Sequence, residues 1–132
     1  MKTSEFCRFT LSVLMIALLS GCGGLDVICG SARPKPIISS ISPATIPLAQ
    51  VAPSFDLTVN GTKFVGASVV IFNGVAVPTV VNSTIKLTAT ITAAMIAAAG
   101  TYNVSVHTPG GTTGDIGCSS GGDSAALVLN VT

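Results

Sequence analysis

The sequence predicts an all-β domain, a sandwich of about seven short strands, and three observations support this prediction. Runs of alternating apolar and polar residues recur along the chain, as in strands that bury one face. The central stretch contains two Asn-Gly pairs, Asn60-Gly61 and Asn73-Gly74, and the second is predicted to turn the chain. Valine, threonine, isoleucine, alanine and glycine dominate the composition, and only 8% of the residues are charged. The 132 residues suffice for one domain and a tail.

The first predicted strand covers residues 37–41, and Ser42-Pro43 ends it. Residues 44–54 follow with two further prolines, Pro47 and Pro53. Because proline cannot donate a hydrogen bond to a strand ladder, this segment is predicted to be irregular or to lie at an edge.

The centre of the chain contains three predicted strands. Residues 56–60 alternate, and residues 68–72 form a β-branched and aromatic run. Asn73-Gly74 then turns the chain, because both residues tolerate a positive φ at little cost. Residues 75–80 are predicted to return from this turn as a single strand.

Residues 84–91 alternate again, and one face of this strand is predicted to point inward with Ile85, Leu87, Ala89 and Ile91. Residues 92–99 form the one helix-prone segment, with Thr92 as a possible cap and Gly100 at its end. We expect it to pack Met95 and Ile96 onto one end of the sandwich.

The last two strands flank a glycine-rich segment. Residues 101–107 place Tyr102, Val104 and Val106 on one face. Residues 109–124 are predicted to be a loop, and a final strand has Leu127, Leu129 and Val131 alternating.

The N-terminus reads as an export signal. Lys2 and Arg8 precede an apolar run at residues 9–19, which is too short to span a bilayer and has the length typical of a signal peptide. The run ends in Leu19-Ser20-Gly21-Cys22, which resembles the bacterial lipobox. Residues 1–21 are therefore predicted to be a lipoprotein signal peptide.

This resemblance implies that Cys22 carries diacylglycerol and acyl chains such as palmitate, and that residues 22–35 form a flexible tether. Each buried CH₂ contributes about 0.8 kcal/mol, so two or three chains would hold the protein at a membrane. Gly23 stands where an aspartate would favour retention at the inner membrane. An exported protein of the outer membrane or cell surface is expected.

Four segments in order carry a family resemblance: IISSISP at residues 37–43, LTVNGTKFVGASVVIFNG at 57–74, LTATI at 87–91 and AAAGTYNVSVHTPGG at 97–111. Together they resemble the IPT/TIG domain, an immunoglobulin-like, early-set β-sandwich of bacterial surface proteins, plexin-type receptors and some transcription factors. The resemblance covers residues 36–132 and implies this fold and a binding role.

The same resemblance gives roles to single residues. Gly61 and Gly66 bracket the turn into Phe64, which should fill the core. Tyr102 stands where immunoglobulin-like folds place a corner tyrosine whose hydroxyl bonds to backbone upstream. Residues 114–122 depart from the family pattern as an apparent insertion.

Two cysteines remain once Cys7 leaves with the signal and Cys22 takes the lipid. Cys29 lies in the tether and Cys118 in the insertion, and such a pair in an exported protein predicts a disulfide bond. Closing a loop of about 90 residues would stabilise the fold by roughly 4–5 kcal/mol on the chain-entropy model. Two free thiols, or a link between molecules, are the alternatives.

The sequence offers little for catalysis. His107 is the single histidine, and Ser105 with Asp56 would be needed to complete a Ser-His-Asp triad. Strand alternation places His107 opposite Val106, on the solvent side. The protein is therefore predicted not to be an enzyme.

Metal and cofactor sites are not predicted either. Two distant cysteines and one histidine do not form a zinc signature. Asp115 and Asp123, in the glycine-rich loop, are the candidates for calcium ligands, but their spacing is not that of an EF-hand.

These observations predict a non-enzymatic, lipid-anchored envelope module that binds a protein or a glycan. The mature chain would carry four basic and four acidic side chains, which argues against nucleic acid as a partner. With no Trp and one Tyr, glycan stacking has few candidates. The loop around Cys118 and the Asn73-Gly74 hairpin are the expected contact points. The alternative is a structural spacer or assembly subunit without a soluble ligand.

Overall fold

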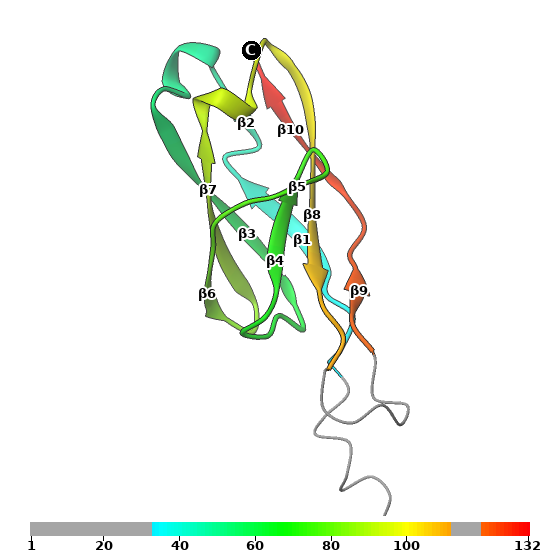
Figure 1. The fold of residues 1–132 in the computed structure, drawn as a ribbon. Helices are drawn as coiled ribbons and strands as arrows, with labels where there is room; N and C mark the ends of the chain where they lie inside the picture. The colour runs from blue at the N-terminus through cyan, green and yellow to red at the C-terminus, as the bar shows by residue number, and fades with distance from the viewer. Residues whose placement is uncertain (1–32, 112–119) are drawn as a thin grey trace, which may run out of the picture.

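The computed structural model describes residues 33–111 and 120–132, and these form two packed β-sheets without an α-helix (Figure 1). The first sheet has the order β1 (Ile37–Ser42), β3 (Ser54–Thr62), β7 (Lys86–Thr92), β6 (Thr79–Ser83). The second has the order β2 (Thr45–Ile46), β10 (Leu127–Val131), β8 (Gly100–Thr108), β4 (Val69–Phe72), β5 (Val75–Ala76), with β9 (Gly122–Asp123) paired to β8. The predicted all-β sandwich is confirmed, but the described residues form ten strands rather than about seven, because β2, β5 and β9 of two residues each were not expected.

The alternating runs bury one face of each long strand, as predicted. In the first sheet Leu57 lies opposite Ala89 and Val59 opposite Leu87, and all four are fully buried. They face the second sheet, whose inward side chains include Val104 and Val106 of β8 and Val70 and Phe72 of β4. Full burial of an aliphatic or aromatic side chain stabilises a fold by roughly 1.5–3 kcal/mol, so this interior is the main source of stability.

The Asn73-Gly74 turn is confirmed. Both residues have a positive φ, 48° and 86°, as a two-residue hairpin turn of the primed type requires. It joins β4 to β5, with Phe72 opposite Val75.

The prediction of one strand over residues 75–80 is wrong. β5 ends at Ala76, and the chain then crosses to the other sheet as β6. Pro78 interrupts the ladder at the crossing because it has no N–H. The Thr79 hydroxyl accepts from the Val70 N–H at 3.0 Å and donates to the Val77 carbonyl at 2.8 Å, so it replaces a backbone partner at the crossing.

Ile85 does not point inward as predicted, since 59% of it is exposed. The residue lies in the turn between β6 and β7, where Ser83 pairs with Lys86. The buried face of β7 therefore begins at Leu87, two residues later than predicted, and Leu87, Ala89 and Ile91 are fully buried.

The predicted helix over residues 92–99 is also absent. Only a 3-10 turn, η3 (Ala93–Met95), forms there, and the extended Thr92 makes no side-chain cap. Isolated helices of this length are marginal in water, so burial of Ile96 determines the local structure. Ile96 is buried and Met95 packs against the core, as expected.

Residues 44–53 are mostly irregular, as their prolines predict. They contain the two-residue strand β2 and a second 3-10 turn, η2 (Leu48–Gln50). β2 was not predicted, because it depends on parallel pairing with β10, where Val131 lies opposite Ile46.

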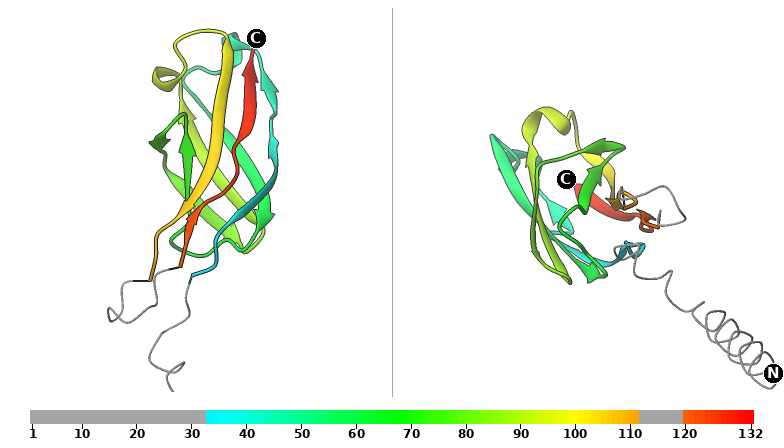
Figure 2. Two further views of the ribbon diagram at one scale, coloured as in Figure 1. Left: turned by 90° about the vertical axis from the view of Figure 1, so that its right-hand side faces the viewer. Right: turned by 60° about the horizontal axis from the view of Figure 1, so that its bottom comes forward.

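The sandwich has two distinct ends (Figures 1 and 2). At the entry end the described chain begins at Arg33, and residues 62–68, 83–86 and 107–111 lie there. Residues 111 and 120, which flank the undescribed segment 112–119, are at this end too. At the far end lie residues 43–53, 93–100 and the C-terminal residue Thr132.

The expected corner tyrosine is present at the far end. The Tyr102 hydroxyl donates to the Ala98 carbonyl at 2.8 Å and accepts from the Ala98 N–H at 3.4 Å. Its ring stacks on Phe72, with centroids 5.4 Å apart and an interplanar angle of 10°. The residue thus ties the segment before β8 to the sheet.

Replacing Tyr102 by phenylalanine is expected to lower the free energy of unfolding by about 1 kcal/mol, the usual contribution of one hydrogen bond. The ring and its stacking on Phe72 stay, so the loss reports the hydroxyl alone. Urea denaturation measures this loss, and the slope of the free energy of unfolding against urea concentration should stay unchanged. Equal stability of Tyr102→Phe and wild type would show that the corner bond contributes nothing in solution.

Candidate functional site

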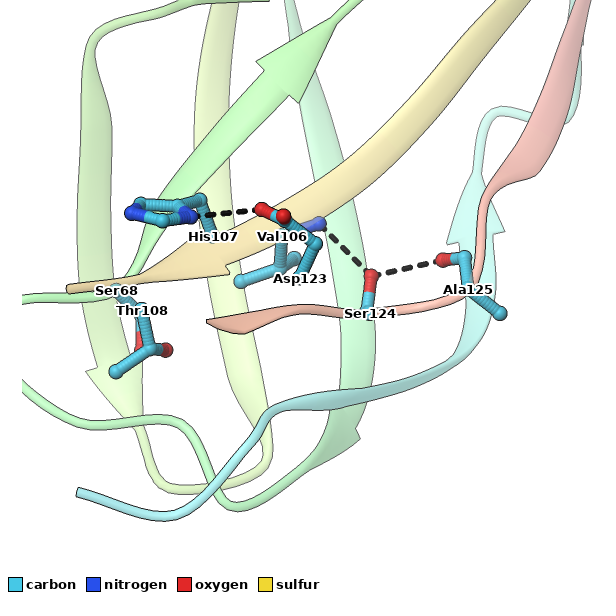
Figure 3. A network of polar contacts seen from close by, with 7 residues as sticks. All are labelled: Ser68, Val106, His107, Thr108, Asp123, Ser124 and Ala125. Atoms are coloured by element: carbon cyan, nitrogen blue, oxygen red, sulfur yellow. Dashed lines mark hydrogen bonds and ion pairs between the residues drawn. The ribbon is translucent and has the colours of Figure 1, made fainter. Parts of the chain in front are cut away.

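A network of polar contacts at the entry end joins β8 to β9 (Figure 3). His107 Nδ1 and Asp123 Oδ1 lie 2.7 Å apart, and their backbones pair across the two strands. The side chains are 43% and 71% exposed. Exposed pairs of this kind contribute little to stability, so the contact orients β9 more than it stabilises the fold.

Ser124 continues the attachment beyond β9. Its backbone N–H donates to the Val106 carbonyl at 2.8 Å, and its Oγ accepts from the Val106 N–H at 2.9 Å. The Oγ also donates to the Ala125 carbonyl at 2.7 Å (Figure 3). The serine hydroxyl thus takes the place of a ladder carbonyl where the strand pairing is interrupted.

A buried hydroxyl pair lies beneath this surface network. Ser68 Oγ and Thr108 Oγ1 are 2.8 Å apart, and both residues are buried. Ser68 Oγ also accepts from the Val65 N–H at 2.9 Å, so the turn before β4 is tied to the end of β8. Buried hydroxyls need such partners, because an unsatisfied one is costly.

Both sides of segment 112–119 are held against the sandwich. Before it, the Arg33 guanidinium donates to the carbonyls of Pro109 at 3.2 Å and Gly110 at 3.4 Å. After it, Gly121 has a φ of 114° and packs so closely that a Cβ on it would lie 2.4 Å from the backbone carbonyl oxygen of Thr108. The described residues therefore fix where this segment leaves and rejoins the fold.

His107 does not contact Asp56, the carboxylate that a triad with Ser105 would need. Asp56 lies on β3, in the other sheet, and accepts from Thr90 Oγ1 at 3.0 Å. The partner of His107 is Asp123, which the sequence suggested only as a calcium ligand. Sequence reasoning missed this pair because Gly122-Asp123 resembles a loop and becomes strand β9 only by pairing with β8.

Ser105 does not complete a triad among the described residues. It lies two positions before His107 on the same outward face of β8, and no hydrogen bond joins the two side chains. A nucleophile must approach its base to hydrogen-bond distance, in the range of about 2.6–3.2 Å. The described part of the site thus pairs a histidine with a carboxylate but does not bring Ser105 to it.

Several predicted site residues lie outside the described residues: Cys22, Cys29, Cys118 and Asp115. Asp123, the second calcium candidate, is described and bonded to His107. Within residues 33–111 and 120–132, no group of three or more His, Cys, Asp or Glu side chains could hold a metal ion. Over the same residues, no helix is long and apolar enough to cross a membrane.

Comparisons with known proteins show no family for this chain. No family model matches the sequence, and no curated protein matches it. Among solved structures, the crystal structure of a "Putative phosphatase" from Bacteroides thetaiotaomicron is similar with a TM-score of 0.47 and 10% identity, over 77% of this chain and 19% of that one. The chain thus spans about a fifth of that protein's length. A likeness this distant carries no argument about activity. The strand order alone characterises the described residues as a β-sandwich domain.

Proposed function

We propose that the protein is a non-enzymatic module of the cell envelope, anchored by a lipid on Cys22, that binds a partner protein through an IPT/TIG-like sandwich. The observation that carries the proposal is the placement of the two ends. The described chain begins at Arg33 at one end, and the far end lies opposite (Figures 1 and 2). A lipid-linked segment before Arg33 would leave the far end facing away from the membrane.

Local geometry supports the IPT/TIG assignment. Phe64 is buried in the core next to Gly61, and the Tyr102 hydroxyl bonds to backbone four residues upstream. Both features were expected from the sequence. Each requires a particular path of the backbone, so the amino-acid composition alone would not produce it.

The far end is the best candidate for partner contact. It is formed by residues 43–53 and 93–100, which contain no charged side chain. Leu48 is 40% exposed there, and residues 97–99 are exposed alanines. The cores of protein interfaces are depleted of charge, and loops on a rigid scaffold often carry recognition.

The two partner-contact points expected from the sequence do not lie at the same end of the sandwich. Residues 111 and 120, which flank the segment containing Cys118, lie at the entry end, which would face the membrane. The Asn73-Gly74 hairpin is nearer the far end, since the Asn73 N–H donates to the Asn103 carbonyl at 2.7 Å. We therefore assign recognition to the far end and its side rather than to residues 112–119.

A pull-down from detergent-solubilised membranes tests binding against the spacer alternative. Wild type should enrich a defined partner, and Leu48→Glu should lose it. Val80→Glu is the matched control, because Val80 is also exposed, at 62%, but lies on the edge strand β6, in the other sheet from the hairpin. Recovery of only the protein itself or bulk envelope proteins would favour the spacer, and equal enrichment by Leu48→Glu would move the contact away from the far end.

Intact mass of protein extracted from native membranes tests the anchor and the disulfide. We expect a mass of residues 22–132 plus acyl chains, lower by two hydrogens until a reductant is added. The contacts of Arg33 with Pro109 and Gly110 support the pairing, because they bring the chain shortly after Cys29 beside the chain shortly before Cys118. A full-length or unlipidated mass would contradict the anchor, and a mass that reductant does not change would contradict the disulfide.

A further inference from the structure

Every lysine and arginine that the structure describes lies at the entry end. Arg33 and Lys35 precede β1, Lys63 directly follows β3, and Lys86 opens β7. The strand register brings these positions together, because Ile37 pairs with Thr62 and Lys86 pairs with Asn60. The positive charge of the described chain is therefore concentrated on one end of the sandwich.

These cations are available to an external partner. Lys35, Lys63 and Lys86 are exposed, while the half-buried Arg33 binds backbone carbonyls. In the described part of the chain no carboxylate lies within ion-pair distance of a lysine, and the Asp123 carboxylate, which is also at this end, contacts His107. Asp56, the other described acid, bonds to Thr90 on the outer face of the first sheet.

Two exposed isoleucines lie among the cations. Ile37 is 50% exposed beside Thr62, and Ile85 is 59% exposed in the turn before Lys86. The Gly61 N–H donates to the Ile85 carbonyl at 3.0 Å, which places this turn against the end of β3. Lysines around aliphatic side chains are typical of surfaces that rest at the interface of a lipid bilayer.

We propose that this cationic end, formed by Lys35, Ile37, Lys63, Ile85 and Lys86, docks on the anionic headgroups of the membrane that holds the protein. The inference rests on the proposed lipid anchor at Cys22. Each cation near an anionic bilayer strengthens association about fivefold, provided it lies within a Debye length of roughly 8–10 Å.

The connecting chain permits this contact. Residues 22–32 separate the proposed lipid from Arg33, and fully extended they span at most about 40 Å. A tether this short keeps the cationic end at high effective concentration near the bilayer, so weak attraction suffices to dock it. Docking in turn holds the far end outward, where the proposed partner contact lies.

Hydrogen exchange on the lipidated protein in vesicles tests the docking. One vesicle is phosphatidylcholine alone, and the other also contains phosphatidylglycerol. On the anionic vesicle, exchange at residues 62–66 and 83–86 should slow by at least about fivefold, while residues 43–50 at the far end should not change. The difference should vanish in 1 M salt, where the Debye length is about 3 Å.

Paired variants separate charge from structure. Lys63→Gln with Lys86→Gln should lose most of the difference between vesicles, since only Lys35 then remains of the exposed lysines that the structure describes. Lys63→Arg with Lys86→Arg should keep the difference, because it preserves both charges. Equal exchange on both vesicles by a protein that stays bound overturns the docking and leaves the anchor intact.

Failure of the anchor is visible separately, as loss of the protein from neutral vesicles on washing. In that case the protein is sedimented with anionic vesicles. Binding to these vesicles would support the docking, and absence of binding would overturn it.

Discussion

Replacement of Gly61 by alanine is expected to destabilise the fold strongly. A Cβ at this position would lie 2.0 Å from the Ile37 carbonyl oxygen and 2.6 Å from Phe64 Cζ. The oxygen belongs to the backbone of β1, and Ile38 pairs with Gly61 in the ladder, so relief requires β1 to separate from β3. We expect the free energy of unfolding to fall by about 3 kcal/mol or more, a large share of the stability of a small domain.

Gly66→Ala is the control, because no atom lies within 4 Å of the position that the added methyl group would take and no unusual φ is required. Its stability should stay within about 0.5 kcal/mol of wild type. Urea denaturation followed by circular dichroism compares the two variants. A Gly61→Ala protein as stable as Gly66→Ala would show that β1 and β3 do not approach this closely.

The sequence predicts the long strands well because their signal is local. Leu57 and Val59 of β3, or Val104 and Val106 of β8, alternate with polar residues, and the structure buries all four. A period of two along one strand suffices to identify its buried face. Neighbouring strands need not be known for this step.

The short strands show what local patterns leave out. β2 and β9 have two residues each and exist only through pairing with β10 and β8. The crossing at Pro78 similarly depends on which sheet offers the next partner. Such pairings are contacts between distant parts of the chain, which composition and alternation do not encode.

The helix predicted over residues 92–99 failed for a related reason. Its alanines have high helix propensity, but propensity is a weak preference over two turns. Burial of Ile96 and the start of β8 at Gly100 require an extended chain there. Tertiary packing therefore overrode the local preference.

The site was predictable in part. Alternation placed His107 on the outward face, and its 43% exposed side chain confirms this. Its partner Asp123 was missed, because the contact exists only after β9 pairs with β8. The gathering of Lys35, Lys63 and Lys86 was missed likewise, since these residues meet only where β1 begins, β3 ends and β7 begins.

Replacement of Phe64 by alanine is the second change expected to have a large effect. Lys63 adopts a φ of 63° directly after β3, and this left-handed residue precedes a phenylalanine whose ring is only 1% exposed. The ring packs against Gly61, whose missing Cβ leaves room for it. Truncation would leave a cavity between the sheets and should lower the free energy of unfolding by about 3–5 kcal/mol.

Val80→Ala supplies the comparison, because Val80 is 62% exposed on the edge strand β6 and its truncation should cost no more than about 0.5 kcal/mol. Phe64→Leu should fall between the two variants, since leucine refills part of the cavity. This graded order of urea midpoints would show that stability depends on the packed ring of Phe64. A domain that any truncation destabilises would not show it. If Phe64→Ala were as stable as Val80→Ala, the entry end would not be sealed by this side chain, and the cationic surface above it would lack the rigid support that membrane docking requires.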